Sequence, residues 1–398
     1  MNLTAEEKQF IRDHASDDAN RLLLGAKKYP QLDVPFLVDQ ILSRRQIREK
    51  LPSWYANEDL VFPAKIAAEQ CSSERTALYK QRLVSSSDTL CDLTGGLGID
   101  SYFFSRKVSQ LTYIERFPVY CEAARHNFQV LGADNITVRN ENSVDIVSEL
   151  PEVDVFYLDP ARRGEGNKRV FALSDCEPDL PRLLPLLLQK APRVIAKLSP
   201  MADLQQTESL LPGTVAIHVL SVRNECKELL FDIRREAAIS TPPVYCVDFT
   251  TTGTEHSFTF TVEEERNSPL TLAAQVGTYL YEPNASVLKA GAFKSVAQQY
   301  GLEKLQISSH LYTSDTLVAG FPGRTFRVEK VLPFSNKVCK SITQEILQAN
   351  ITVRNFPMSV DDLRKKTKIQ EGGDVYLFAT TLSDGGKVLV VCRKVSNI

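Results

Sequence analysis

Between residues 88 and 235, short apolar segments alternate with segments of helical spacing, and this alternation limits the possible folds more than any other feature of the sequence. Short apolar runs separated by helical patterns are typical of a mainly parallel sheet with helices on both faces. The sequence therefore predicts an α/β domain with a doubly wound sheet. The apolar segments are TLCDLT, QLTYIER, NITVRN, VDVFYLDP, RVIAKLSP, VAIHVLSV and ELLFDIRR.

The regions on either side of this domain have different patterns. The N-terminal region has helical spacing, as in FLVDQILSRRQIREKL, and predicts a separate helical domain. The C-terminal third contains strand-like segments such as VYCVDFT and HSFTFTVEE, while NASVLKAGAFKSVAQQYGL predicts a helix. We expect this third to be an α+β region of two small units joined near residues 322–326. The predicted domains are residues 1–80, 81–238, 239–325 and 326–398.

Composition limits the class of protein. A net charge of -2 over 398 residues gives no overall attraction to polyanions, so contact with nucleic acid would need a local patch. The eight cysteines include no Cys-x-x-Cys pair and the five histidines are scattered, so we expect reduced thiols and no metal site. The N-terminus is charged, and no run of about 18 apolar residues occurs. These features predict a cytoplasmic protein with no membrane contact.

A glycine-rich turn, DLTGGLG, follows the first apolar segment and precedes a predicted helix. Glycine allows a backbone to approach a ligand closely, and the start of a helix favours electron-rich groups. Glu115 ends the next strand, where a carboxylate can accept hydrogen bonds from ribose hydroxyls. The turn and Glu115 together predict a nucleotide-type cofactor.

The first position of the turn helps to separate the candidate cofactors. Dinucleotide-binding turns have the form G-x-G-x-x-G, whereas Asp92 stands here three residues before the first glycine. DLTGGLG followed by YIER resembles motifs I and II of the class I S-adenosylmethionine (SAM)-dependent methyltransferases, with their Rossmann-like sheet. The resemblance implies SAM, while NAD or FAD and a purely structural turn remain alternatives.

This resemblance also implies which residues surround the cofactor. In these enzymes the acidic residue and the glycine turn hold the methionine part of SAM. Asn142 stands where the superfamily often has an aspartate near the adenine amino group, and an amide oxygen can accept the same hydrogen bond. The expected cofactor-binding residues are Asp92, Thr94, Gly95, Gly96, Gly98, Glu115 and Asn142.

The fourth strand ends in DPARRG, at the sheet edge where ligands bind in such folds. Asp159 and Pro160 resemble motif IV of methyltransferases that modify nucleic-acid bases, in which the side chain accepts a hydrogen bond from the target amino group. The aromatic residue common in that motif is missing, and Arg162 offers a plane that can stack on a base or hold phosphate. The expected catalytic residues are Asp159, Pro160 and Arg162, with Lys197 as an orienting charge.

Each of these residues also has a structural interpretation. Asp159 could cap a turn, Arg162 and Arg163 could be a solvated pair, and Lys197 could belong to a structural ion pair. The motif DPAR-x-G looks most like that of RNA uridine-C5 methyltransferases, which need a cysteine nucleophile after the fifth strand. That stretch, IAKLSPMADL, has Ser199 and no cysteine. The sequence therefore disfavours C5 chemistry and leaves direct transfer to a nitrogen or, less favoured, an oxygen.

The order of motifs along the whole chain carries a further resemblance. YLDPARR, AKLSPM, VRNECKELLF, YEPNASVLKAG and KKTKIQEGGDVYLFATT follow the glycine turn in this order. From about residue 30 onward, the chain resembles a family of bacterial class I methyltransferases, typical of Bacteroidetes, that end in a ferredoxin-like unit and a THUMP-like domain. THUMP domains are associated with RNA-modifying enzymes, so the resemblance implies an RNA substrate.

A basic segment, LRKKTK at residues 363–368, could contact phosphates, although such a run is more often a solvated helix face. We expect a SAM-dependent methyltransferase that modifies a base nitrogen in structured RNA, such as rRNA or tRNA, without a covalent cysteine intermediate. The alternatives are a methyltransferase acting on protein or a small molecule and a non-catalytic module that binds SAM or RNA. The sequence leaves the modified nucleotide and the oligomeric state open.

Overall fold

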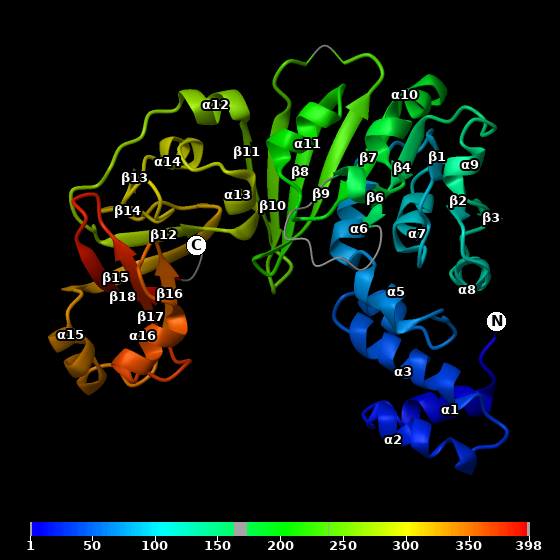
Figure 1. Ribbon diagram of the computed structural model, residues 1–398, viewed down its shortest axis with the longest axis horizontal. Helices are drawn as coiled ribbons and strands as arrows, with labels where there is room; N and C mark the ends of the chain where they lie inside the picture. The colour runs from blue at the N-terminus through cyan, green and yellow to red at the C-terminus, as the bar shows by residue number, and fades with distance from the viewer. Residues whose placement is uncertain (1, 163–172, 238, 396–398) are drawn as a thin grey trace. The chain divides into compact units, whose positions relative to one another are not determined.

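The computed structural model of the chain describes residues 2–162, 173–237 and 239–395. The chain forms two compact units. The first contains the N-terminal helices and one part of a large sheet, and the second contains the other part and the C-terminal region (Figure 1). The first unit comprises Met1–Val215 and Leu229–Ile239, and the second comprises Ala216–Glu228 and Ser240–Ile398.

The N-terminal helices start at side chains that cap them. The Thr4 hydroxyl accepts a hydrogen bond from the Glu7 backbone, and the Glu7 carboxylate accepts one from the Thr4 backbone, which forms a capping box. Asp18, Asp33 and Ser73 each accept a capping hydrogen bond at later helices. The helices predicted from the spacing are thus present. They are α1 (Ala5–Asp13), α2 (Ala19–Leu24), η1 (Ala26–Lys28), α3 (Val34–Ile47), α4 (Pro52–Tyr55), α5 (Lys65–Gln70) and α6 (Glu74–Gln81).

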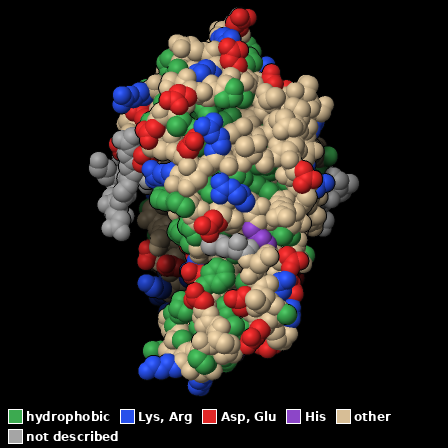
Figure 2. All heavy atoms as spheres, turned by 90° about the vertical axis from the view of Figure 1, so that its right-hand side faces the viewer, with side chains coloured by type: hydrophobic (Ala, Val, Ile, Leu, Met, Phe, Trp, Pro, Cys, Tyr) green, Lys and Arg blue, Asp and Glu red, His purple; other side chains and the backbone are tan. Residues whose placement is uncertain are grey.

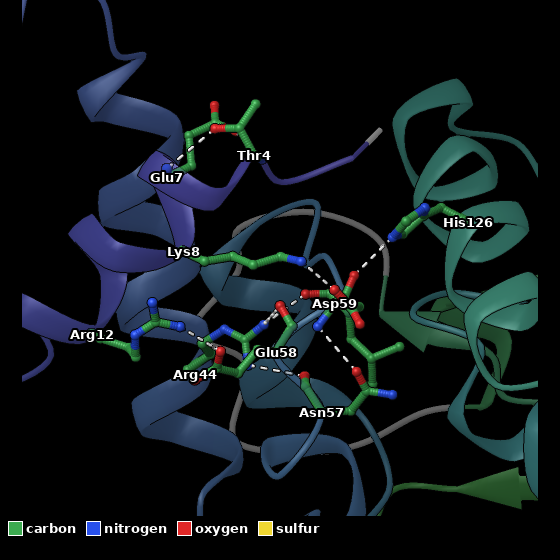
Figure 3. Close-up of polar contacts among 10 residues, drawn as sticks. Thr4, Glu7, Lys8, Arg12, Arg44, Asn57, Glu58, Asp59 and His126 are labelled. Carbon is green, nitrogen blue, oxygen red and sulfur yellow. Dashed lines mark hydrogen bonds and ion pairs between the residues drawn. The ribbon is translucent and has the colours of Figure 1, made fainter.

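A loop of residues 57–62 lies between these helices and helix α8 (Pro118–Val130) of the sheet region (Figure 3). Arg44 of α3 donates hydrogen bonds to three backbone carbonyls of this loop. Lys8 of α1 forms an ion pair with Asp59, and a ring nitrogen of His126 on α8 lies 2.8 Å from the backbone oxygen of Asp59. The loop therefore fastens the outer helices to the sheet region through polar contacts.

The large sheet has the strand order β11-β10-β8-β9-β7-β4-β1-β2-β3. Neighbouring strands from β7 to β3 are parallel, and β9 is antiparallel to β7. This arrangement confirms the predicted α/β fold, and it brings the carboxyl ends of β1, β2, β4 and β7 to one edge. The strands are β1 (Thr89–Asp92), β2 (Gln110–Glu115), β3 (Ile136–Asn140), β4 (Val155–Leu158), β7 (Arg193–Leu198), β8 (Thr214–Val222), β9 (Glu225–Arg234), β10 (Pro243–Phe249) and β11 (Glu255–Thr261).

Aromatic pairs pack the helices onto this sheet. The rings of Phe104 and Tyr157 lie edge to face with centroids 5.0 Å apart, and those of Phe128 and Tyr113 are 5.6 Å apart. Such pairs bury large apolar areas in a defined geometry. They therefore fix the two tyrosines on β4 and β2, near the carboxyl edge. The further elements of the first unit are α7 (Ile99–Ser105), α9 (Ser143–Ile146), β5 (Ala161–Arg162), η2 (Leu173–Asp175), β6 (Cys176–Glu177), α10 (Leu180–Lys190) and α11 (Leu204–Leu210).

In the second unit, a seven-stranded sheet has the order β13-β14-β12-β15-β18-β17-β16. The predicted single helix in NASVLKAGAFKSVAQQYGL is wrong, because Gly291 with φ 78° ends one helix and a second begins at Ser295. The elements are α12 (Val262–Asn267), β12 (Tyr279–Pro283), α13 (Ala285–Ala290), α14 (Ser295–Tyr300), β13 (Glu303–Lys304), β14 (Tyr312–Ser314), β15 (Gly323–Pro333), α15 (Asn336–Ser341), η3 (Ile342–Gln344), β16 (Asn350–Arg354), α16 (Val360–Thr367), β17 (Val375–Thr381) and β18 (Lys387–Lys394).

A buried carboxylate connects distant strands of this second sheet. Glu282 on β12 accepts hydrogen bonds from Arg324 on β15 at 2.9 Å and from Arg354 on β16 at 2.8 Å. The Glu282 side chain is 1% exposed, and two guanidinium groups compensate the loss of its hydration. The two small units predicted for the C-terminal third are joined in this sheet, because β12 pairs with β15. The segments VYCVDFT and HSFTFTVEE, expected in the first of these units, instead form β10 and β11 of the large sheet, where β10 pairs with β8.

Candidate functional site

A cavity of about 250 Å³ lies at the carboxyl edge of the sheet in the first unit. The glycine turn after β1 and the residues that end β2 and β4 line it, together with part of the N-terminal helical region. Ligands bind at this edge in doubly wound folds. All seven predicted cofactor-binding residues line the cavity: Asp92, Thr94, Gly95, Gly96, Gly98, Glu115 and Asn142.

The glycine turn packs directly against β2. The Gly95 amide donates a hydrogen bond to the Ile114 carbonyl at 2.9 Å, and a side chain at Gly95 would overlap the ring of Tyr113. The Tyr113 hydroxyl in turn donates to the Gly96 carbonyl at 2.5 Å. Gly98 adopts φ 83°, a conformation that most residues avoid, and leads into α7. The glycines are therefore needed both for close packing and for the direction of the turn.

Asp92 is almost fully buried at 1% exposure. Its carboxylate accepts a hydrogen bond from the Thr94 amide at 3.0 Å and another from the Ser101 hydroxyl at 2.6 Å. Burial raises the pKa of Asp92 to about 7, against the opposing effect of these two hydrogen bonds. Asp92 thus stabilises the turn and titrates near neutral pH.

Glu115 connects the glycine turn to the end of β2. One carboxylate oxygen accepts from the Gly96 amide and the other from the Phe117 amide, both at 2.9 Å. A carboxylate has about four acceptor positions, so Glu115 keeps capacity for a ligand in the cavity. Asn142 caps α9 by accepting from Val144 at 3.3 Å, which occupies its amide oxygen weakly. Their roles in cofactor binding remain predictions.

The DPARRG turn that follows β4 contacts the glycine turn through Thr94. The Asp159 amide donates to the Thr94 hydroxyl at 2.6 Å, so the ends of β1 and β4 are joined. The Asp159 carboxylate forms an ion pair with Lys197 at 2.5 Å; the side chains are 39% and 9% exposed, respectively. The structure therefore places both in the cavity wall, where Asp159 remains accessible.

The other two predicted catalytic residues are placed differently. Pro160 is buried and is not among the described residues that line the cavity. The backbone of Arg162 pairs with Cys176 in the β5–β6 ladder, while its side chain lies outside the described part of the chain. Arg163 also lies outside it. Of the expected catalytic residues, the structure thus brings Asp159 to the cavity.

The charge of the cavity lining helps to separate the candidate cofactors. Carboxylates outnumber cationic side chains among the described lining residues, so the cavity favours a positively charged ligand. The pyrophosphate of a dinucleotide would meet this excess of negative charge, which counts against NAD and FAD. Six carboxylates (Asp92, Asp100, Glu115, Glu141, Asp159 and Glu177) and two cations (Arg116 and Lys197) line the cavity.

The N-terminal region supplies part of the cavity lining. The sequence suggested only that the stretch EQCSSERTALYKQ could pack over the cofactor, without naming site residues in it. Gln70 at the end of α5 and Cys71 and Ser72 after it line the cavity, as do Asp100 and Tyr157. Asp100 could have been found, because it stands two residues after the glycine turn in the first turn of a predicted helix. Burial raises the pKa of the Cys71 thiol, so this cavity cysteine is a poor nucleophile.

The described part of the chain offers neither a metal-binding cluster nor a membrane-spanning helix. Within residues 2–162, 173–237 and 239–395, no group of three or more His, Cys, Asp and Glu side chains could hold a metal ion. No helix in that same described part is both long and apolar enough to cross a membrane.

A solved structure with the same architecture decides the family. It is called a "putative methyltransferase" from Porphyromonas gingivalis W83, and it covers 98% of this chain and 98% of its own, with 38% identity and a TM-score of 0.89. This chain belongs to the same methyltransferase family. Two segments also match family models, residues 279–322 a ferredoxin-like domain and residues 323–394 a THUMP-like domain. The family expected from the motifs is confirmed.

More distant structures share only part of this methyltransferase. A precorrin-6y C5,15-methyltransferase from Geobacter metallireducens GS-15 is 16% identical, covering 41% of this chain and 87% of its own, with a TM-score of 0.30. An rRNA methylase from Streptococcus thermophilus is 9% identical, with 40% and 93% coverage and a TM-score of 0.30. Similarity this low does not bear on function. The comparison with curated proteins gave no match.

Proposed function

We propose that the chain is a SAM-dependent methyltransferase that modifies a base nitrogen in structured RNA. The observation that carries this proposal is the cavity itself: an acid-rich pocket at the glycine turn, with the accessible carboxylate of Asp159 at its wall. Thr94 joins the two parts through the hydrogen bond from the Asp159 amide. Cofactor and target would therefore meet at one rigid edge of the sheet.

The cavity lining fits SAM, a cation with ribose, adenine and methionine parts. Glu115 would accept hydrogen bonds from the ribose hydroxyls, and Asn142 would lie near the adenine. The backbone of the glycine turn would hold the methionine part. Gly95 and Gly98 let this turn pack closely against the rings of Tyr113 and Phe128, which sets its position at the cavity. SAM supplies an electrophilic methyl group on its sulfonium sulfur.

Asp159 would orient the target amino group by accepting one of its hydrogen bonds. Lys197 holds the Asp159 carboxylate in place through their ion pair. Methyl transfer from the sulfonium sulfur to the target nitrogen would leave that nitrogen with an additional proton, which the Asp159 carboxylate in the cavity wall or water would accept. The raised pKa of Cys71 supports transfer without a covalent cysteine intermediate.

The THUMP-like match at residues 323–394 supports an RNA substrate. Acidic and basic side chains are interspersed over the face in Figure 2, so this face offers no extended basic surface to RNA. Helix α16 offers a local basic segment: Leu363 is buried, while Lys365 and Lys368 are exposed. Lys366 lies 5.2 Å from the centre of the Phe334 ring and so also takes part in packing.

Transfer of labelled methyl groups from SAM tests this proposal. The purified chain is incubated with labelled SAM and either total RNA or protein extract from cells that lack it. We expect label in RNA that RNase removes. The Asp159→Ala variant should still bind SAM and lose transfer, whereas Asp92→Ala should lose SAM binding.

Other outcomes select the alternatives. Label that resists RNase and stays with protein would replace RNA by a protein substrate. Binding of SAM without formation of S-adenosylhomocysteine in any pool would favour a non-catalytic module, in line with the missing aromatic residue after Pro160. Full turnover by Asp159→Ala would remove that residue from the mechanism.

A further inference from the structure

Lys80 on α6 is a lysine buried completely, with 0% exposure. It forms an ion pair with Asp100 at 2.9 Å and donates a hydrogen bond to the Ser72 hydroxyl at 2.8 Å. Lysine is almost never fully buried unless it is paired, because the desolvation of its charge is costly. The N-terminal helical region therefore places a cation immediately behind the candidate cofactor site.

Asp100 joins this lysine to the cavity wall. It lies in the first turn of α7, and its second carboxylate oxygen accepts from the Tyr157 hydroxyl at 2.6 Å and from Ser72 at 2.8 Å. Ser72, Asp100 and Tyr157 line the cavity, whereas Lys80 is not among the described lining residues. The negative end of the ion pair thus faces the cavity, and the positive end faces away from it.

The electrostatic balance keeps Asp100 charged. Burial acts to raise the pKa of Asp100, but the charges of Lys80 and Lys197 and the hydrogen bond from Tyr157 outweigh it, so the pKa lies below its usual value. Asp92 at the end of β1 is a second carboxylate that interacts with Asp100, and its own pKa is raised. Asp100 is accordingly a fixed anion in the cavity wall at neutral pH.

Attachment of the N-terminal helices does not by itself require this buried charge. The loop of residues 57–62 already fastens them, because the Asn127 side chain exchanges two hydrogen bonds with the Val61 backbone, each of 2.8 Å. Replacing a buried ion pair by apolar side chains of similar volume is often neutral or stabilising. A charge held at a cavity wall suggests a role toward the ligand.

We propose that Lys80 is a positioning residue that holds Asp100 as a fixed anion against the cavity, so that the site prefers the cationic methyl donor SAM to its neutral product. The inference rests on the proposed function. SAM carries a sulfonium charge that S-adenosylhomocysteine lacks, while both carry the same ammonium and carboxylate groups. An anion in a buried wall favours the ligand with the additional positive charge. The N-terminal region thereby contributes to selection of the substrate form of the cofactor and to release of the product.

Isothermal titration calorimetry of the full chain with SAM and with S-adenosylhomocysteine tests this inference. The readout is the ratio of the two dissociation constants, which a purely structural role would leave unchanged. We expect the preference for SAM to fall roughly tenfold in the double variant Lys80→Met/Asp100→Asn, and further in Asp100→Asn, where the Lys80 ammonium remains behind the wall without its partner. The double variant removes both charges and leaves no buried charge unpaired. It should therefore fold, so that its ligand preference can be measured even if Asp100→Asn does not fold. Lys8→Met, which breaks an ion pair far from the cavity, is the matched control.

The outcomes separate the two proposals. If the wild-type chain binds neither SAM nor S-adenosylhomocysteine, the proposed function fails. If it binds both, and the folded double variant keeps the wild-type ratio, the inference about Lys80 and Asp100 is overturned while the cofactor assignment stands. Equal weakening of both ligands in Asp100→Asn would likewise reduce the pair to a structural support.

Discussion

The two walls of the cavity are built in different ways. Hydrogen bonds among residues 92–117, such as those of Glu115 with Gly96 and Phe117, hold the glycine-turn wall. Another part of the lining combines residues 70–72 of the N-terminal region with Asp100 and Tyr157, and Asp100 contacts Ser72 and Tyr157 across 28 and 57 positions of sequence. A wall made within one βαβ unit is visible as a motif, whereas a wall made by contacts distant in sequence is not.

Two aspartates show what this difference means for charge. Asp92 and Asp100 are both buried, yet the pKa of Asp92 is raised to about 7 and that of Asp100 is lowered. The hydrogen-bond donors of Asp92 are a neutral amide and a hydroxyl, whereas Asp100 also faces the ammonium of Lys80. Burial alone favours the neutral acid, and a nearby cation reverses this preference.

The largest predicted effect is a pH dependence of the free energy of unfolding, caused by the raised pKa of Asp92. Its pKa is raised from 3.8 to about 7 on folding, so between these values the unfolded chain loses a proton that the folded chain keeps. This contribution to stability is fully present below pH 3.8 and is lost as pH rises to about 7. The stability of wild type relative to Asp92→Asn should therefore fall by about 4 kcal/mol over this window. Urea unfolding of both proteins at several pH values measures it, and a constant difference would contradict the raised pKa.

Removal of Lys80 alone should have the next largest effect. Lys80→Met leaves the buried Asp100 carboxylate without its cation and should reduce the free energy of unfolding by about 3 kcal/mol. The double variant Lys80→Met/Asp100→Asn should recover most of this loss. Chemical denaturation at pH 7 measures all three proteins. A double variant no more stable than Lys80→Met would show that the ion pair does not account for the loss.

A side chain at Gly95 should damage the glycine-turn wall. Gly95→Ala would place a methyl group into the ring of Tyr113, and such overpacking should reduce stability by about 2 kcal/mol and weaken SAM binding. Gly25→Ala is the control, because Gly25 has φ -85° and its nearest neighbouring atom would lie 3.3 Å from the new methyl group. Thermal unfolding and calorimetry compare the two variants. An equal response at Gly25 and Gly95 would refute the close contact with Tyr113.

The smallest effect is expected from loss of the Lys8–Asp59 ion pair, which connects α1 to the loop of residues 57–62. Lys8→Met breaks an ion pair whose partner, Asp59, is 58% exposed, and exposed pairs typically contribute below about 1 kcal/mol. Stability and the preference between SAM and S-adenosylhomocysteine should both stay near the wild-type values. If Lys8→Met changed the ligand preference as much as Asp100→Asn does, the Lys8–Asp59 and Lys80–Asp100 ion pairs would not differ as proposed.

Local patterns predicted much of the fold and the part of the cavity lining that follows β1, β2 and β4. The strands from β1 to β9 of the large sheet and the helices of residues 1–80 follow from hydrophobic spacing, because periodicity is a property of neighbouring residues. The same spacing did not show that β10 and β11 join this sheet, because strand pairing is a tertiary contact. The single helix expected around Gly291 was wrong, since only the backbone shows that this glycine adopts φ 78°. Pro160 was expected at the site but is not among the residues found to line it, because a motif gives the position of a turn and not which of its side chains face inward.

By itself, the sequence determined the α/β fold, the glycine turn and the place of Glu115 and Asp159 at strand ends, because each depends on residues close together in the chain. The tertiary structure decided that Thr94 joins the two turns, that Lys197 pairs with Asp159, and that Lys80 stands behind Asp100. These contacts join different strands and helices, and the charge state of a buried carboxylate depends on which cation the fold brings beside it.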